Sequence, residues 1–417
     1  MHLSPRAFRP RVLQITQPVD GGVARVVADL TRAQLAADLA VTVACPDGFL
    51  AGTLRSLGAE VRPWPAGRAP GPALASEVAR LARIVTDVRP DVVHAHSAKA
   101  GLAARLAVRG RIPTVFQPHA WSFEAVNGVM AALARGWERR AARWTGRVVC
   151  VSQAERRRGE RAGIRARWSV IPNGVAPDRF RPAAGTDHRT DPGSDAVRSR
   201  LLAGVAPGAP VVVCVGRLCR QKGQDVLLAA WERVRGQVPE ARLVLVGDGP
   251  DRARLRSLAP ESVLFAGPVA EAAPWYRAAD LVVLPSRWEG MALAPLEAMA
   301  CGRPVLVTDV DGAREALPPT LAARCLVPPE DPAALADHAA ALLLDPPARE
   351  AMGRQGRAHV LATHDVRHTA AAVTAVYREL LGVGPAAGVP SARPTETTEA
   401  IDTTEAEAIE YRESSHP

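Results

Sequence analysis

The sequence predicts an α/β protein made of two doubly wound parallel-sheet domains that face each other across a cleft. Three observations lead to this fold class. Short β-branched runs alternate with stretches whose apolar residues recur every three or four positions, as in parallel strands joined by covering helices. The alternation runs twice, with a polar, proline- and glycine-rich connector between the two series. The length of 417 residues also suits two domains.

Apolar runs along the chain mark the candidate strands of both series. They are RVLQI (11–15), VTVA (41–44), VVHA (92–95), TVFQ (114–117), VVCV (148–151), VVVCV (211–215), LVLV (243–246), LVVLP (281–285) and PVLVT (304–308). Helical spacing lies between them, as in Val23, Val26, Val27 and Leu30. In such folds, functional sites lie at the carboxyl ends of the strands.

These elements divide the chain into five predicted parts. They are an N-terminal Rossmann-like domain (1–172), a linker (173–208), a C-terminal Rossmann-like domain (209–364), a helix that packs back on the first domain (365–382) and an acidic tail (383–417). The tail is rich in Thr and Glu and nearly devoid of large apolar residues, so we expect it to be disordered.

The net charge of +9 is distributed unevenly along the chain. Residues 1–172 carry +14, whereas the stretch from Ser391 to the end carries −5. A basic half suits an anionic partner such as a phosphate group, nucleic acid or membrane surface. Because no aromatic-rich RNA-binding strand, helix-turn-helix signal or zinc spacing occurs, we do not expect nucleic acid as a partner.

The hydropathy pattern bears on location. No apolar run approaches the ~18 residues that span a bilayer. Polar residues and prolines interrupt the N-terminus before Val12, which is unlike a signal peptide. We therefore expect a cytoplasmic protein.

Fifty of the 52 cations are arginine, and the two lysines are Lys99 and Lys222. Arg217 and Lys222 lie five residues apart in VGRLCRQKG, directly after a predicted strand. Two cations in a strand-end loop before a helix form a suitable cradle for a diphosphate. Taken alone, the segment is better explained by two solvated cations.

Two glutamates eight residues apart follow the predicted strand 281–285. In SRWEGMALAPLEAMACGRPV, Glu289 lies in a loop, and Glu297 falls in the first turns of a helix that begins near Leu293. Both then point into one strand-end crevice, where carboxylates accept hydrogen bonds from sugar and ribose hydroxyls. Singly, each would be interpreted as a surface or helix-terminal glutamate.

Taken in order, these motifs resemble those of the family-4 retaining glycosyltransferases, which have the GT-B fold. The second half contributes VGRL…KG, GDGPDRARL and an E-x7-E pair followed by AMACGRPV. The first half contributes DGGVARVV, HAHSAKAG, QPHAW and VSQAE…VIPNGV. The resemblance covers roughly residues 11–380. HAHSAKAG and QPHAWSFE resemble the exopolysaccharide and lipid-linked-glycan branch of this family.

The resemblance implies a role for each matching residue. Arg217 and Lys222 would hold the donor diphosphate, and Glu297 would bind the ribose. Glu289 and the backbone after Gly290 would hold the donor sugar, which His119 would face from the first domain. The implied catalytic residues are His119, Arg217, Lys222 and Glu289, and the implied donor-binding residues are Gly21, Gly22, Arg217, Lys222, Glu289, Gly290, Met291, Ala292, Leu293 and Glu297. Because family members use no metal, neither a metal nor another cofactor is expected.

The chain departs from the family pattern at two places. His119 is followed by Ala120 where the family usually has glycine, and Asp311-Gly312 stands where it has two glycines. Asp309 and Asp311 thereby form a D-V-D sequence that imitates the metal motif of a different transferase fold. Because the surrounding motifs fit GT-B, we interpret this sequence as incidental.

His96 and Lys99 are candidates for the acceptor side of the cleft. His94 and His96 share one face of a strand end, and without a third ligand they indicate structural or acceptor-side histidines rather than a metal site. Lys99 follows at the start of a predicted helix. A contact with an acceptor phosphate and an ordinary helix-terminal lysine both remain open.

Residues 129–167 combine eleven arginines with three acids. Helical spacing relates Met130, Leu133, Trp137, Ala141 and Trp144 on one face, and Arg135, Arg139 and Arg143 on another. An interfacial helix on an anionic membrane surface fits this pattern. An amphipathic helix that packs inward with a solvated basic face fits it as well.

The predicted function is transfer of a sugar, with retention, from a nucleotide-diphosphate sugar to a glycan or polyprenyl-diphosphate-linked acceptor. A UDP-sugar is the favoured donor, and the inner face of the cell membrane is a further expected partner. The alternatives are a GT-B nucleotide-sugar epimerase and a non-catalytic nucleotide-sugar or nucleic-acid binding protein. Donor turnover that is lost in Glu289→Ala would separate an enzyme from a binder.

Overall fold

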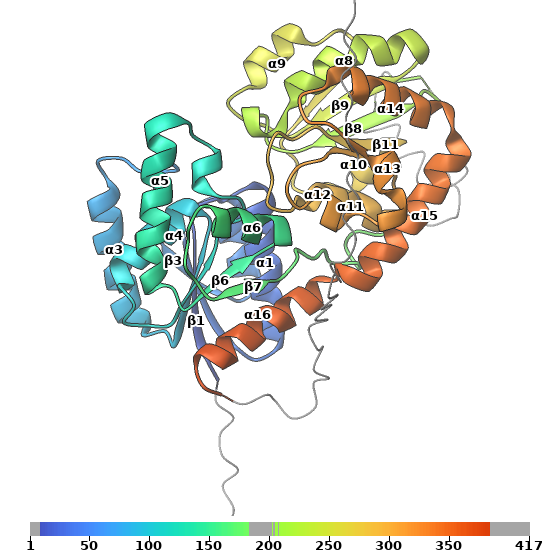
Figure 1. The fold of residues 1–417 in the computed structure, drawn as a ribbon. Coiled ribbons are helices and arrows are strands. Elements are labelled where there is room, and N and C mark those ends of the chain that lie inside the picture. The colour runs from blue at the N-terminus through green and yellow to red at the C-terminus, as the bar shows by residue number, and fades with distance from the viewer. Residues whose placement is uncertain (1–8, 183–201, 203–204, 207, 384–417) are drawn as a thin grey trace, which may run out of the picture. The chain divides into compact units, whose positions relative to one another are not determined.

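The computed structural model describes residues 9–182, 202, 205–206 and 208–383, which contain two parallel sheets (Figure 1). The first sheet has the order β3-β2-β1-β4-β5-β6-β7, and the second has the order β10-β9-β8-β11-β12-β13. The strand order reverses next to β1 and β8, as in doubly wound folds. The predicted fold class is confirmed. Much of the predicted linker, and the predicted tail beyond Val383, lie outside the described residues.

All strand pairs within the two sheets are parallel. The strands are β1 (Arg11–Thr16), β2 (Ala40–Cys45), β3 (Glu60–Pro63), β4 (Val92–His96), β5 (Thr114–Gln117), β6 (Arg147–Cys150), β7 (Trp168–Val170), β8 (Val211–Val215), β9 (Arg242–Val246), β10 (Val263–Gly267), β11 (Leu281–Leu284), β12 (Val305–Thr308) and β13 (Leu326–Val327).

Four strands have no counterpart among the runs identified in the sequence, namely β3, β7, β10 and β13. All four are edge strands. Central parallel strands are covered on both faces and therefore appear as continuous apolar runs. The edge strands are partly exposed, as in β3 and β7, where no residue is fully buried, so that signal is missing from their sequences.

Helices cover the faces of both sheets. The α-helices are α1 (Gly21–Ala36), α2 (Phe49–Ser56), α3 (Leu74–Val88), α4 (Ala98–Val108), α5 (Gly128–Ala141), α6 (Gln153–Arg161), α8 (Gln224–Gln237), α9 (Arg252–Leu258), α10 (Ala273–Ala278), α11 (Leu293–Ala300), α12 (Ala313–Ala316), α13 (Ala322–Cys325), α14 (Pro332–Leu344), α15 (Pro346–Thr363) and α16 (Val366–Leu380). Short 3-10 helices are η1 (Ser122–Glu124), η2 (Ala142–Trp144), η3 (Arg220–Lys222) and η4 (Pro319–Leu321). Among the described residues, no helix combines the length and apolar character needed to cross a membrane.

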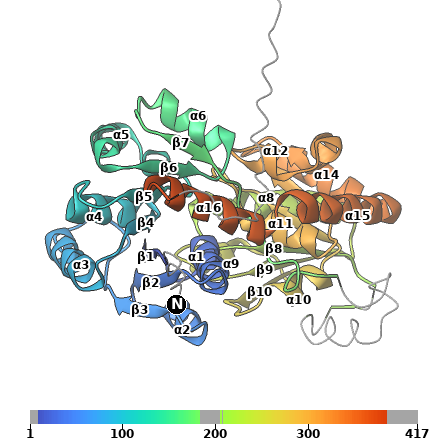
Figure 2. The same cartoon turned by 90° about the horizontal axis from the view of Figure 1, so that it is seen from below.

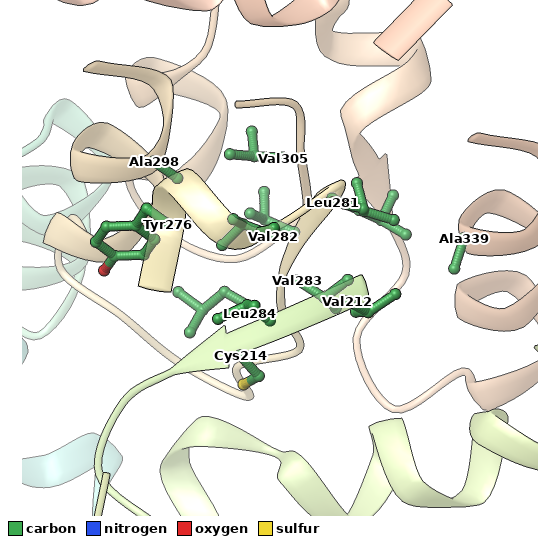
Figure 3. Packing of buried hydrophobic residues seen from close by; sticks show 14 of the residues in the cluster. Val212, Cys214, Tyr276, Leu281, Val282, Val283, Leu284, Ala298, Val305 and Ala339 are labelled. Atoms are coloured by element: carbon green, nitrogen blue, oxygen red, sulfur yellow. The ribbon is translucent and has the colours of Figure 1, made fainter. Parts of the chain in front are cut away.

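The core of the second half forms around β8 and β11. Figure 3 shows Val212 and Cys214 of β8 with Leu281 to Leu284 of β11, and Ala339 of α14 approaches from one side. These side chains are at most 3% exposed. Burial of apolar side chains on both faces holds the two strands in register, so that their carboxyl ends open at the same edge of the sheet.

Helix α16 follows the second half in sequence but packs on the first. Figure 2 shows it beside α1, and its buried residues Val373, Val376 and Tyr377 belong to the hydrophobic cluster of the first sheet. The Tyr377 hydroxyl lies 2.6 Å from His94 Nδ1 and accepts a hydrogen bond from Gln34 Nε2 at 3.2 Å. The Tyr377 hydroxyl therefore gives a hydrogen-bond partner to both His94 and Gln34, which are buried in the first half.

We expect Tyr377→Phe to lower the free energy of unfolding by about 1–3 kcal/mol, because it leaves buried donors and acceptors of His94 and Gln34 without a partner. Urea unfolding followed by circular dichroism measures this loss. In a double-mutant cycle with Gln34→Leu, the double variant should lose less stability than the sum of the losses of the two single variants. Strict additivity would show that the hydroxyl does not couple α16 to α1.

Candidate active site

Lys222 and Glu289, which come from motifs 67 residues apart, meet at the carboxyl ends of β8 and β11. The Lys222 ammonium forms an ion pair with Glu289 Oε1, which also accepts a hydrogen bond from Ser286 Oγ at 2.8 Å. Glu289 is 8% exposed. Gly223 makes the approach possible: its φ is +66°, and a Cβ there would overlap the carbonyl oxygen of Pro285.

Glu297 is buried in α11 and contacts both halves of the chain. Its Oε2 accepts a hydrogen bond from the Tyr276 hydroxyl at 2.8 Å, and Arg25 Nε of α1 lies 3.2 Å from its Oε1. Burial raises the pKa of Glu297, while the charge of Arg25 and the Tyr276 hydroxyl oppose that rise. A ribose hydroxyl at Glu297 would therefore share the carboxylate with Arg25. Neither Arg25 nor Tyr276 was identified from the sequence.

The glycine-rich loop lies against the start of α11. A Cβ on Gly22 would come within 3.9 Å of Leu293 Cδ1, while Gly21 has a φ of +71° and open space around it. Helices α1, α8 and α11 all begin without a side-chain cap. Their first backbone N–H groups are available to an anion, which the positive ends of the helix dipoles also favour. Met291, Ala292 and Leu293 belong to this segment, and Met291 O is held by Asn173 Nδ2 at 2.8 Å.

Arg217 has no acidic partner in the part of the chain that the structure describes. Burial lowers the pKa of Arg68, and the positive charge of Arg217 lowers it further. Two guanidinium groups that repel each other beside uncapped helix ends favour binding of an anion. Arg68 comes from the loop after β3, and no pattern in the sequence singled it out.

Lys99 holds the loop that carries Arg68. Its ammonium lies 2.6 Å from Glu77 Oε2 and donates to Ala69 O at 3.1 Å, while Glu77 Oε1 accepts from Gly67 N at 2.8 Å. Lys99 is 5% exposed. This placement disfavours the contact with an acceptor phosphate and indicates a structural lysine instead.

Three histidines form a row from β4 into the loop after β5, in which His94 and His96 are fully buried and His119 is partly exposed. His96 Nδ1 lies 3.2 Å from His119 Nε2, and the rings of His94 and His96 are 4.0 Å apart. Burial lowers the pKa of His94 and of His119 to about 3, and that of His96 falls well below its usual value. All three rings are therefore neutral at pH 7. His96 is fully buried, which disfavours a direct contact with an acceptor.

The loop after Glu289 is held by residues of the first half. Ser152 Oγ donates to Gly290 O at 3.0 Å, and a Cβ on Gly290 would lie 3.1 Å from Ala120 N. The His119-Ala120 turn therefore lies directly against the Glu289-Gly290 loop. This places His119 close to the donor-sugar position that the resemblance implied.

Asp309 and Asp311 are both paired with arginines. Asp309 pairs with Arg314, and Asp311 pairs with Arg158, whose Nη2 lies 2.9 Å from Oδ1. Across the described ranges, no group of three or more His, Cys, Asp or Glu side chains is placed to hold a metal ion. The two aspartates act as partners of cations in this arrangement.

The two doubly wound sheets and the cations, carboxylates and uncapped helix ends between them define a protein of the GT-B class. A model of the group 1 glycosyl transferases matches residues 209–345, and a model of glycosyltransferase family 4 matches residues 20–179. The chain belongs to the family-4 glycosyltransferases.

Two of the similar proteins are named as glycosyltransferases of lipid-linked compounds. The GDP-mannose-dependent alpha-(1-6)-phosphatidylinositol monomannoside mannosyltransferase of Mycobacterium tuberculosis is 35% identical over 277 residues, which are 62% of this chain and 67% of the relative. The UDP-Gal:alpha-D-GlcNAc-diphosphoundecaprenol alpha-1,3-galactosyltransferase of Escherichia coli is 30% identical, over 56% of this chain and 61% of the relative. The chain spans about half to two thirds of the length of the curated relatives it matches.

Solved structures share the fold. Anabaena Alr3699/HepE, solved in complex with UDP and glucose, superposes with a TM-score of 0.76 at 23% identity, covering 89% of this chain and all of that one. Sucrose-phosphate synthase of Thermosynechococcus elongatus superposes with a TM-score of 0.74 at 22% identity, covering 90% of this chain and all of that one. At these identities the likeness shows the fold alone.

Ala120 adopts a backbone conformation that favours glycine, with a φ of +105°. We expect Ala120→Gly to raise the free energy of unfolding by about 1 kcal/mol, because the relief of strain exceeds the added entropy of the unfolded chain. Urea unfolding measures the change. Ala125→Gly is the matched control in the same loop, since Ala125 has a φ of −82° and should lose stability. A loss in both variants would contradict the strain at Ala120.

Proposed function

We propose that this chain transfers a sugar, with retention, from a nucleoside-diphosphate sugar to a lipid-linked acceptor without a metal ion. The observation that carries the proposal is the ion pair of Lys222 and Glu289 beside the uncapped starts of α1, α8 and α11, with Arg217 in the same loop as Lys222. Fixed positive charge there stabilises the diphosphate as it leaves the sugar, which is the stage at which negative charge develops.

The remaining site residues suit the sugar and the nucleoside. Glu289, which Ser286 orients, accepts hydrogen bonds from sugar hydroxyls, and Glu297 accepts them from the ribose. His119 is uncharged at pH 7, so it can orient a hydroxyl without repelling the cationic character that develops on the sugar ring. In this proposal, Arg25 holds Glu297 in position from the first half.

The similar proteins differ in the nucleotide that their names and structures give for the donor. HepE was solved with UDP, whereas the mycobacterial relative is named as GDP-mannose-dependent. We retain UDP-sugars as the first donors to test, with GDP-mannose as the second.

The acceptor class rests on relatives and on surface chemistry. The two characterised relatives described above are named for acceptors with a lipid and a phosphate group. In this chain, α5 exposes Val129, Met130 and Leu133 by 76%, 60% and 61%. Large apolar side chains clustered on a basic domain favour a membrane surface that carries such an acceptor.

We expect Arg217→Ala to lower turnover roughly 10²–10³-fold, because it removes a charge that acts on the leaving diphosphate. Transfer from radiolabelled UDP- and GDP-sugars to lipid extracts measures the effect. Arg220→Ala is the matched control in the same loop, since Arg220 stacks over Trp288 and is exposed. Equal activity of Arg217→Ala and wild type would remove Arg217 from the site.

The same assay includes an arm with EDTA, in which we expect unchanged transfer. Loss of transfer that Mg²⁺ or Mn²⁺ restores would contradict the metal-independent mechanism and assign a role to Asp309 and Asp311. Release of a free sugar product in the absence of an acceptor would favour the epimerase.

We expect Met130→Gln/Leu133→Gln to weaken binding to anionic liposomes several-fold, because each side chain contributes about 1 kcal/mol or more when buried in the interface. Sedimentation with anionic and neutral liposomes measures binding, which should also weaken between 0.1 and 1 M salt as the Debye length falls from ~10 to ~3 Å. Leu258→Gln/Leu344→Gln is the control, because these leucines are 56% and 61% exposed on other helices. Equal binding of both variants would remove α5 from the membrane surface.

The structure limits the apolar face of α5 to its first turns. Trp137 is partly buried, with its ring centroid 6.2 Å from that of Trp144 and 5.7 Å from the Arg105 guanidinium, and Ala141 is buried. The predicted stripe therefore divides into an exposed part and a part that packs inward. The arginines predicted to share a solvated face also differ in their surroundings. Arg139 Nε donates to Ala162 O at 2.6 Å, whereas Arg135 lines a pocket.

A further inference from the structure

A pocket of about 1010 Å³ lies beside the donor crevice. Helices α5 and α6 line it from the first half, and residues 287–288, 309–312 and 314–315 line it from the second. Its lining is rich in charged side chains, which are Glu124, Arg135, Arg157, Arg158, Arg161, Arg287, Asp309, Asp311, Arg314 and Glu315. No role for this pocket followed from the sequence motifs.

The four carboxylates in the pocket already have partners. Arg158 Nε lies 2.8 Å from Glu124 Oε1 and also pairs with Asp311, and Arg314 pairs with Asp309. Glu315 accepts hydrogen bonds from the backbone N–H groups of Gln153 and Ala154 at the start of α6, at 2.6 and 2.8 Å. These acids are therefore committed to Arg158, Arg314 and the N-terminus of α6.

Three arginines in the pocket are weakly neutralised: two have no carboxylate partner among the described residues, and the third has a distant one. Within the described part of the chain, Arg135 and Arg161 have no carboxylate at ion-pair distance, and Arg157 Nη2 lies 3.9 Å from Glu315. Arg157 and Arg161 are four residues apart on α6 and so share a face. Guanidinium groups that converge without carboxylates suit phosphate oxygens, which they bind in bidentate geometry.

The wall of the pocket touches the loop that holds the donor sugar. Gly312 lines the pocket with a φ of +74°, and a Cβ on it would overlap the carbonyl oxygen of Gly290. Gly290 follows Glu289 directly. An anion in the pocket would therefore lie beside the position where the sugar is transferred.

An apolar surface adjoins the same pocket. Val126 lines it and is 37% exposed, and the exposed residues Val129 and Met130 follow at the start of α5. A ligand with a phosphate in the pocket and a hydrocarbon chain along α5 would satisfy both surfaces.

We propose that Arg135, Arg157 and Arg161 form the site that binds the phosphate groups of the lipid-linked acceptor. The inference rests on the proposed function, because it locates the acceptor of that same reaction. A phospholipid of the bulk membrane carries a phosphate too, but it has no need of a pocket beside the donor sugar.

Calorimetry on the full chain saturated with UDP tests this site. A parallel sample is saturated with GDP, so that whichever nucleotide the chain binds fills the donor crevice and a second diphosphate must bind elsewhere. The probe is farnesyl diphosphate, and farnesol is its uncharged counterpart. We expect saturable binding of farnesyl diphosphate and much weaker binding of farnesol.

The variant is Arg135→Gln/Arg161→Gln, for which we expect a loss of roughly tenfold or more in affinity for farnesyl diphosphate, because each guanidinium contributes charge-assisted hydrogen bonds. Arg157→Gln alone should lose a smaller part. Arg140→Gln/Arg156→Gln is the matched control, since it changes the same charge on the same two helices outside the pocket lining. Equal losses in both double variants, or no binding by wild type, would overturn the proposal.

Two further outcomes separate this inference from its alternatives. If the double variant loses binding to anionic vesicles but retains farnesyl diphosphate, the pocket serves bulk headgroups and the acceptor site is overturned. The proposed function fails if the wild-type chain transfers no sugar. The calorimetric titration tests a separate question, namely whether binding of the probe depends on the three arginines.

Discussion

The position of the Gly290-Met291 backbone determines the geometry of the whole site. Ser152 Oγ and Asn173 Nδ2 donate to its two carbonyl oxygens at 3.0 and 2.8 Å. Gly312 packs on its other side without a Cβ. Glu289 immediately precedes this segment and α11 follows it, so the carboxylate proposed to bind the sugar and the uncapped helix end both depend on these contacts. The close approach leaves little room for any side chain at Gly290.

The ion pair between Lys222 and Glu289 suggests how a donor is accommodated. The two side chains are 20% and 10% exposed, so neither charge is well solvated and each depends on the other. Separating them in a dry site would be costly. When a donor binds, its diphosphate would become the new partner of Lys222, and its sugar hydroxyls would become the new partners of Glu289. Neither charge would then be left buried without a partner. Ser286 keeps Glu289 oriented during that exchange.

The sequence predicts the fold and the residues of the motifs better than it predicts the side chains that contact those residues. Central strands and the E-x7-E pair carry local signals, so both could be identified. Arg25 and Tyr276 could not, because their contact with Glu297 joins residues 272 and 21 positions away that follow no shared motif. In the sequence, Arg135 and Arg139 share one basic face of a predicted helix. Only the fold shows that Arg135 lines the pocket, whereas Arg139 donates to the backbone carbonyl of Ala162.

The two lysines of the chain show what a composition bias can and cannot predict. Lysine is rare in a chain in which 50 of the 52 cations are arginine, and both lysines pair with a glutamate in a confined space. The bias did not indicate what each pair does. Lys99 is enclosed with Glu77 and holds a loop, whereas Lys222 faces the crevice. A guanidinium is wider and would need further acceptors at either place, while the arginines of the pocket have room to present their planar groups to phosphate.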